Sequence, residues 1–136
     1  AEGNRSVLAG VPRSLPAMVK AQRIKEKAHG VGFDWDDASG VWDKVEEEIS
    51  ELKAELREGN TEKARMEMGD VFFSLINYAS HLGINAEDAL ELTNKKFIAR
   101  FMEMERLAAA DGKSLPEMDI QEMDTYWERA KAALLK

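Results

Sequence analysis

Residues 68–79 read MGDVFFSLINYA and are apolar around most of the circumference of a helix. When each residue is placed about 100° from the last, the polar residues of this segment and its flanks share one narrow stripe: Glu67, Asp70, Ser74, Asn77 and His81. Carboxylates on such a helix must find partners, because an unpaired buried charge is costly or takes up a proton. The segment therefore predicts a central helix that carries a functional stripe.

The preceding segment, Val41–Leu56, predicts a second amphipathic helix. Its apolar residues recur at three- and four-residue spacing and form a face toward the core. Glu48 lies at the edge of that face with Glu51 one turn later, whereas Glu46 and Glu47 point elsewhere. Because a charged run is usually a solvated surface, this helix on its own favours an ordinary exposed face.

The two helices together carry two acidic pairs, joined through a short Gly59-Asn60 turn. Glu48 and Glu51 on one helix would repel Glu67 and Asp70 on the other without a cation between them. The chain has no cysteine and two histidines, so the ligands on offer are carboxylate oxygens, which suit magnesium or manganese better than zinc. The pattern predicts a Mg²⁺ site that also accepts Mn²⁺.

Glycine, proline and asparagine residues divide the chain into helical segments, and no segment alternates as a strand does. Asn85 and Asp119 have the pattern of helix caps, because each precedes an acid by three residues. A length of 136 residues favours one domain over residues 15–136, after a linker or tail over residues 1–14. The sequence predicts an all-α bundle with helices over about Pro16–Ala28, Val41–Arg57, Thr61–Leu82, Ala86–Ala110 and Ile120–Leu134.

The net charge of −7, from 19 basic and 26 acidic side chains, argues against binding a nucleic-acid backbone. It is compatible with a phosphate substrate, since divalent cations can sit between carboxylates and phosphates. No apolar run of about 20 residues predicts a membrane span, and the first fourteen residues lack the apolar core of a signal peptide. With no cysteine present, these features predict a cytoplasmic protein.

The acidic motifs resemble those of a known family. Glu47–Glu51 followed by Glu67–Asp70 resembles the EExxE…ExxD signature of the MazG nucleotide pyrophosphohydrolases, part of the all-α NTP pyrophosphatase superfamily. Residues 6–12 resemble the connection into the second module of a two-module MazG protein, which implies a C-terminal catalytic module. The resemblance covers most of the chain and includes Leu15–Ala17, Val31–Trp35, Asn77–Gly83 and Asn94–Phe101.

This resemblance implies an activity, a cofactor and an assembly. The activity is hydrolysis of NTPs or dNTPs between the α and β phosphates, which gives the monophosphate and pyrophosphate and serves nucleotide-pool housekeeping. The assembly is a homodimer with a four-helix core shared between subunits. The cofactor is magnesium, held by Glu48, Glu51, Glu67 and Asp70.

Other polar residues near the four acids are candidates for supporting roles. Glu47 and Glu51 are alternatives for the base that accepts a proton from the attacking water. Asn77 is a candidate to support the metal shell or to orient a water molecule. His81 is expected to complement the helix dipole rather than to join the site, and His29 has no evident partner in the sequence.

Lys96 and Arg100 lie four residues apart and would present two cations to phosphate oxygens beyond the reach of the metal. The family resemblance supports that role. Without it, an equally good interpretation is that both side chains extend over Phe97 and Phe101 and keep their charges in water.

Aromatic residues offer candidates for contact with a base. Trp127 and Lys131 resemble an aromatic and basic pair that lies near the nucleotide in the family, although a tryptophan on an amphipathic last helix is more often core or interface. Phe33 and Trp35, in a glycine-flanked loop, have the same two interpretations.

Two other functional classes compete with the enzyme. A non-catalytic helical module that dimerises or binds a basic partner through its acidic surface explains the second helix but not the acids at Glu67 and Asp70. A redox di-metal bundle needs two Glu-x-x-His pairs. Glu26 with His29 is one such pair and the sequence has no second, which makes that class a weak alternative.

Overall fold

The computed structural model describes residues 6–34 and 37–135. Within these residues it contains five α-helices, one short 3-10 helix and no strand, which confirms the predicted all-α class. The chain forms two compact units, residues 1–88 and 89–136. The single domain predicted over residues 15–136 and the tail over residues 1–14 stay predictions. In the part of the chain that is described, no helix is both long and apolar enough to cross a membrane.

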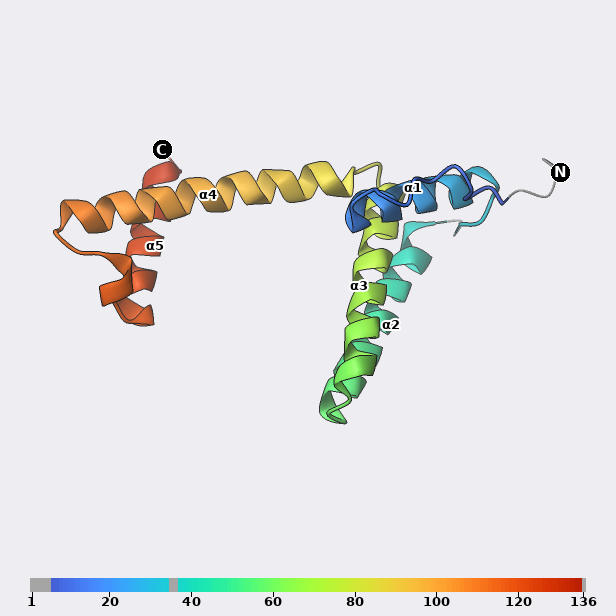
Figure 1. Cartoon of the computed structure of the whole chain (residues 1–136), viewed down its shortest axis with the longest axis horizontal. Coiled ribbons are helices and arrows are strands. Elements are labelled where there is room, and N and C mark those ends of the chain that lie inside the picture. The colour runs from blue at the N-terminus through green and yellow to red at the C-terminus, as the bar shows by residue number, and fades with distance from the viewer. Residues whose placement is uncertain (1–5, 35–36, 136) are drawn as a thin grey trace. The chain divides into compact units, whose positions relative to one another are not determined.

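The first unit contains three helices, α1 (Ala17–Gly30), α2 (Ala38–Arg57) and α3 (Thr61–His81). Helices α2 and α3 lie side by side as an antiparallel hairpin, and α1 packs on α3 (Figure 1). The hairpin turn is short because Gly59 adopts a positive φ of 71°. Asn60 then caps α3 by accepting a hydrogen bond from the amide of Lys63 at 3.1 Å.

The predicted helix boundaries are close to the observed ones. Helices α4 and α5 have the predicted bounds, Ala86–Ala110 and Ile120–Leu134. The largest difference is at the start of α2, which begins at Ala38 rather than Val41. The Asp37 side chain accepts a hydrogen bond from the amide of Gly40, and this cap starts the helix before the first apolar residue.

Small apolar residues bring α2 and α3 close together. Val41 and Val45 of α2 are fully buried, and Val71 and Ile76 of α3 are also buried. The predicted core face of α2 is therefore confirmed at Val41 and Val45, whereas Trp42, which was predicted on the same face, is 41% exposed. Leu56, at the other end of the same face, is 60% exposed beside the hairpin turn.

Helix α3 is less enclosed than a central helix is expected to be. Its side toward α1 and α2 is buried, but Met68, Phe72 and Leu75 are between 41% and 55% exposed. These three residues recur at helical spacing and so form one apolar stripe. The described chain leaves this stripe open to solvent.

The second unit consists of most of α4 (Ala86–Ala110), a 3-10 turn η2 (Leu115–Glu117) and α5 (Ile120–Leu134). Asn85 and Asp119 cap α4 and α5 as predicted, accepting bonds from the amides three residues later at 2.9 and 2.8 Å. The hydroxyl of Tyr126 donates to Asp111 at 2.6 Å and ties α5 to the end of α4. The core of this unit is formed by Met104, Ala108, Met118, Tyr126 and Ala130.

Candidate metal centre and substrate pocket

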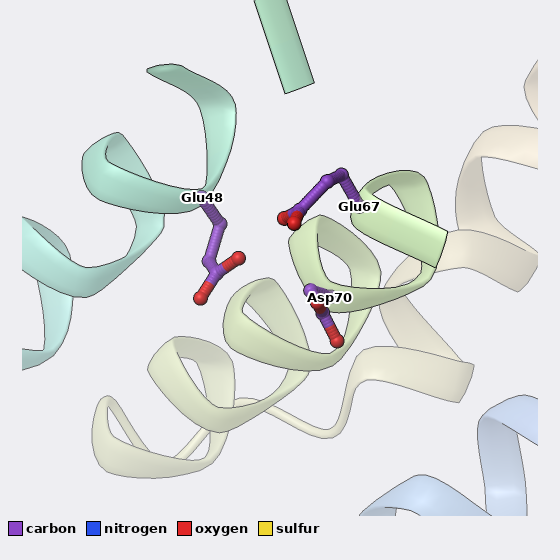
Figure 2. A group of neighbouring side chains, drawn as sticks. All are labelled: Glu48, Glu67 and Asp70. Atoms are coloured by element: carbon purple, nitrogen blue, oxygen red, sulfur yellow. The ribbon is translucent and has the colours of Figure 1, made fainter. Parts of the chain in front are cut away.

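Three carboxylates from α2 and α3 converge at one point of the hairpin. Oxygens of Glu48, Glu67 and Asp70 all lie within 4.8 Å of one another. Figure 2 shows Glu48 extending from α2 toward the two acids of α3, which are one turn apart. The facing arrangement predicted from the sequence is therefore confirmed for these three residues.

The environment of these carboxylates suits a cation. Glu48 is only 7% exposed, although the sequence placed it at the margin of the core. Three buried carboxylate oxygens of the described residues have no hydrogen-bond partner, and two of them, Oε2 of Glu48 and Oε2 of Glu67, belong to this cluster, while the third is Oε2 of Glu55. Buried polar atoms are nearly always paired, so such atoms need an ion, a water molecule or a proton.

The electrostatics of Glu67 point the same way. Burial, followed by the nearby Glu51 carboxylate, raises the pKa of Glu67 from 4.5 to about 7. The proximity of the Glu48 carboxyl group and the charge of Asp70 also raise this pKa. Glu51 thus lies close to Glu67 but outside the group of three converging carboxylates, and its assignment as a metal ligand stays a prediction.

The donor set identifies the class of ion that fits. All three converging groups offer hard carboxylate oxygens, and neither thiolate nor imidazole belongs to the group. Magnesium, manganese and calcium prefer such oxygens, whereas zinc favours nitrogen and sulfur. The unpaired buried oxygens of Glu48 and Glu67 leave ligand positions for such an ion, so the residues fit a hard divalent cation.

Lys44 holds the remaining oxygen of Glu48. Its Nζ atom is 3.1 Å from Oε1 of Glu48 and 3.3 Å from Oε1 of Glu47, one turn away on α2. These carboxylates raise the pKa of Lys44, with the hydrogen bond to Glu48 as the main cause. One oxygen of Glu48 is therefore oriented by Lys44 while the other remains without a partner.

A cavity of about 470 Å³ opens beside the carboxylates and lies wholly within the first unit. Glu48, Asp70 and Lys44 line it at the carboxylate cluster. Ser74 and Asn77, both buried, also line it, and so continue the polar stripe of α3 into the cavity. The volume is within the range of about 300–1,000 Å³ that is typical of small-molecule sites.

The loop after α1 forms another wall of the cavity. Oδ2 of Asp34 is 2.5 Å from Nδ1 of His29 and 3.7 Å from Nδ1 of His81. His29 therefore has a partner that the sequence did not reveal, because Asp34 reaches it only after Gly32 reverses the chain with a φ of 89°. His81 lies in the last turn of α3, where it was expected to complement the dipole.

Phe33 projects from this loop, which the contact between Asp34 and His29 holds in place. Its side chain is 74% exposed and lines the cavity, so it is available to contact a ligand. Trp35, the other aromatic residue of the loop, lies outside the described residues.

The remaining candidates for substrate binding lie in the second unit. The ring centroids of Phe97 and Trp127 are 5.2 Å apart, and Trp127 packs against the core of this unit. Lys96 and Lys131 are exposed and Arg100 is partly buried. Trp127 is partly buried against this core, and the substrate contacts of these four residues stay predictions.

The cavity residues that sequence reasoning did not assign to the site include Lys25 of α1, Asp34, and Phe73 of α3. A signal for Lys25 was present. Met18, Gln22 and Lys25 follow one another at spacings of four and three residues, which places them on one stripe, and all three are partly buried. A lysine on the inward stripe of a short helix indicates that its charged end reaches a polar space.

Known proteins resemble this chain over the site just described. Residues 40–103 match the family model of the MazG nucleotide pyrophosphohydrolase domain, and this range contains Glu48, Glu67 and Asp70. The chain therefore contains a MazG domain. The match also contains all of α3 and most of α2, so the MazG domain includes the hairpin that positions the carboxylates.

Three curated relatives illustrate the similarity. A nucleoside triphosphate pyrophosphohydrolase of Escherichia coli K12 is 42% identical over 132 residues, which are 96% of this chain and 50% of that protein. A nucleoside triphosphate pyrophosphohydrolase/pyrophosphatase MazG of Thermotoga maritima is 44% identical over 117 residues, 86% of this chain and 45% of that protein. The uncharacterized protein YabN of Bacillus subtilis is 42% identical over 127 residues, 93% of this chain and 26% of that protein. The chain thus spans half or less of the length of each of these relatives.

Proposed function

We propose that this chain hydrolyses nucleoside triphosphates, including deoxynucleotides, to the monophosphate and pyrophosphate, in a reaction that requires magnesium and serves nucleotide-pool housekeeping in the cytoplasm. The observation that carries the proposal is the convergence of Glu48, Glu67 and Asp70 at the edge of a ligand-sized cavity, with two buried oxygens left unpaired. The names of the E. coli and Thermotoga relatives support the reaction class.

Magnesium, with manganese as a substitute, would be held by Glu48, Glu67 and Asp70, and we propose Glu51 as a fourth ligand because its charge acts on Glu67. When bound, the ion supplies neutralisation of phosphate charge and a lower pKa for a bound water molecule. This accounts for a phosphate substrate in a chain whose net charge is −7.

The protein itself supplies a proton acceptor and a binding cavity. Water hydrolyses the anhydride bond between the α and β phosphates. The water oxygen bonds to one of these two phosphorus atoms as the anhydride bond breaks, and a proton of the water passes to a carboxylate. The products are the monophosphate and pyrophosphate. Glu51 and Glu47 remain the two candidates for that carboxylate. Glu51 lies beside Glu67, whereas Glu47 is ion-paired with Lys44.

Polar and aromatic groups are proposed to bind the rest of the nucleotide. The buried amide of Asn77 lines the cavity and has no hydrogen bond to any described residue, so it can bind the substrate. Phe33 lines the cavity, and we propose that it stacks on a base. From the second unit, Lys96, Arg100 and Lys131 are proposed to contact phosphates and Trp127 to contact the nucleoside.

We also propose that two copies pair, because apolar surface on the chain needs a cover. The stripe of Met68, Phe72 and Leu75 on α3 is exposed, as are Phe97 and Ile98 of α4, each at 56%. Large exposed apolar patches on a protein usually mark an interface. Light scattering after gel filtration should give a mass of twice 15.3 kDa. A mass of 15.3 kDa over a wide concentration range would contradict a stable homodimer with a shared four-helix core.

The activity is tested directly with a panel of ribo- and deoxynucleoside triphosphates. The purified chain with magnesium should release the monophosphate and pyrophosphate in equal amounts, measured by anion-exchange chromatography, and EDTA should stop the reaction. Release of nucleoside diphosphate and phosphate would show that the bond assignment is wrong. If no triphosphate is cleaved with magnesium or manganese, the non-catalytic interaction module becomes the better interpretation.

A further inference from the structure

One cation in the cavity has no anionic partner among the described residues. Lys25 of α1 lines the cavity, and its Nζ atom lies 5.3 Å from the centroid of the Phe73 ring. None of the ion pairs between described residues includes Lys25, although the cluster around Glu48 is rich in acids. The other lysine of the cavity, Lys44, is already paired with Glu47 and Glu48.

The position of Lys25 relative to the carboxylates follows from α3. Phe73 comes one helical turn after Asp70, which corresponds to a rise of about 5 Å. Phe73 is therefore nearer than Asp70 to the C-terminal end of α3. At that end Asp34 lies near His81, and the neighbouring Phe33 lines the cavity. The ammonium group over Phe73 therefore lies on the path from the carboxylate cluster to the Phe33 loop.

We propose that Lys25 binds an oxygen of the α-phosphate of the nucleotide. The inference rests on the proposed function: the β and γ phosphates lie at the metal site, the nucleoside points toward Phe33, and the α-phosphate lies between them beside Lys25. A nucleotide in this orientation provides the anion that the lysine lacks within the described chain.

The Phe73 ring explains why this lysine is ready to bind. A cation over the face of an aromatic ring is attracted by the ring, and the contact restricts the long side chain without neutralising its charge. Lys25 is also partly buried, so a phosphate oxygen would meet it away from bulk water, where charge-assisted hydrogen bonds are stronger.

The test compares Lys25→Met with Lys27→Met, a matched change at an exposed lysine of the same helix that does not line the cavity. Calorimetry with AMP, CMP, GMP and UMP in the presence of manganese should show that Lys25→Met weakens the tightest monophosphate by about tenfold or more. Binding of the matching nucleoside, which has no phosphate, should not change. Lys27→Met should behave as the wild type in both titrations.

Two further measurements separate charge from packing and test the orientation. Lys25→Arg keeps a cation and should restore most of the monophosphate affinity and of kcat/KM. Inhibition by inorganic pyrophosphate should be the same in Lys25→Met and the wild type, because pyrophosphate occupies the other side of the metal site. Equal monophosphate affinity in the Lys25→Met and Lys27→Met variants would overturn the inference. A Lys25→Met variant in which only the inhibition by pyrophosphate becomes weaker would also overturn it.

The outcomes for Lys25 and for the proposed function remain distinguishable. A wild-type chain that cleaves triphosphates while Lys25→Met and Lys27→Met behave alike removes only the role of Lys25. A wild-type chain that cleaves none removes the proposed function. The binding titrations do not depend on turnover, and in that case they still report whether Lys25 contacts a phosphate.

Discussion

Glu48→Gln and Asp70→Asn should each reduce turnover of nucleoside triphosphates by at least about 100-fold. Each substitution removes one negative charge from the group of carboxylates that converge within 4.8 Å and leaves the side-chain shape almost unchanged. Losing a residue that merely orients a metal ligand costs about 10–100-fold in affinity or activity, so losing a ligand itself should cost no less. Initial rates with magnesium measure the effect.

The loss should come from metal binding and not from unfolding. In the metal-free chain the substitutions relieve repulsion with Glu67, so helix content by circular dichroism should stay at the wild-type level. Affinity for manganese, measured by calorimetry, should fall together with the rate. Glu46→Gln is the matched control, because Glu46 is exposed on the same helix and lies outside the cluster. Near-normal turnover by both Glu48→Gln and Asp70→Asn would remove the proposed metal site.

Local patterns account for how well the helices were predicted. The starts of α4 and α5 follow from caps that act within a few residues: Asn85 and Asp119 accept bonds from amides three positions later. Helical periodicity likewise distinguished Glu48 from its exposed neighbour Glu46, because a difference of two positions moves a side chain to another face.

The part of the site that was missed depends on contacts between distant segments. Asp34 contacts His29 because the chain reverses at Gly32, and it also lies near His81, which belongs to the end of another helix, α3. No periodic pattern encodes such pairs. Lys25 enters the cavity for the same reason, since its role depends on where α1 packs against α3.

Burial of the acids was also hard to predict. A charged run on α2 reads as a solvated face, yet Glu48 is 7% exposed while Glu46 and Glu47 are exposed. Proximity of the other helix makes the difference, because the oxygens of Glu48 are enclosed by α3 and by Lys44. The acids of α3 were expected to be buried because their helix is apolar, but Glu67 is only partly buried and Asp70 is exposed.

Affinity for manganese should rise by about tenfold per pH unit up to about pH 7 and level off above it. The cause is Glu67, whose pKa is raised to about 7 by burial and then by the charge of Glu51. A carboxyl group must lose its proton to bind a metal ion, so below about pH 7 each ion that binds displaces one proton. Above that pH the group is already ionised and the dependence disappears.

The same pKa gives the opposite sign for the stability of the metal-free chain. The folded-state pKa of about 7 is above the ordinary value of 4.5, so folding favours the protonated form of Glu67. Its contribution to stability is fully present below about pH 4.5 and is lost as the pH rises through about 7. Manganese should reverse this trend, so the increase in Tm that it causes should be larger at about pH 8 than at about pH 6.

Proton release distinguishes Glu67 from other titrating groups. Calorimetry in two buffers of different ionisation enthalpy should show close to one proton released per manganese ion at about pH 6 and almost none above about pH 8. Glu67→Gln should bind manganese weakly and without this pH dependence, whereas Glu62→Gln, at an exposed acid of the same helix, should match the wild type. Release that stays near zero across this range would mean that Glu67 is already ionised in the metal-free fold, and the repulsion from Glu51 and Asp70 would then be relieved in another way. The pH at which release ends therefore measures how strongly the fold forces these carboxylates together, and a bound cation offsets that cost.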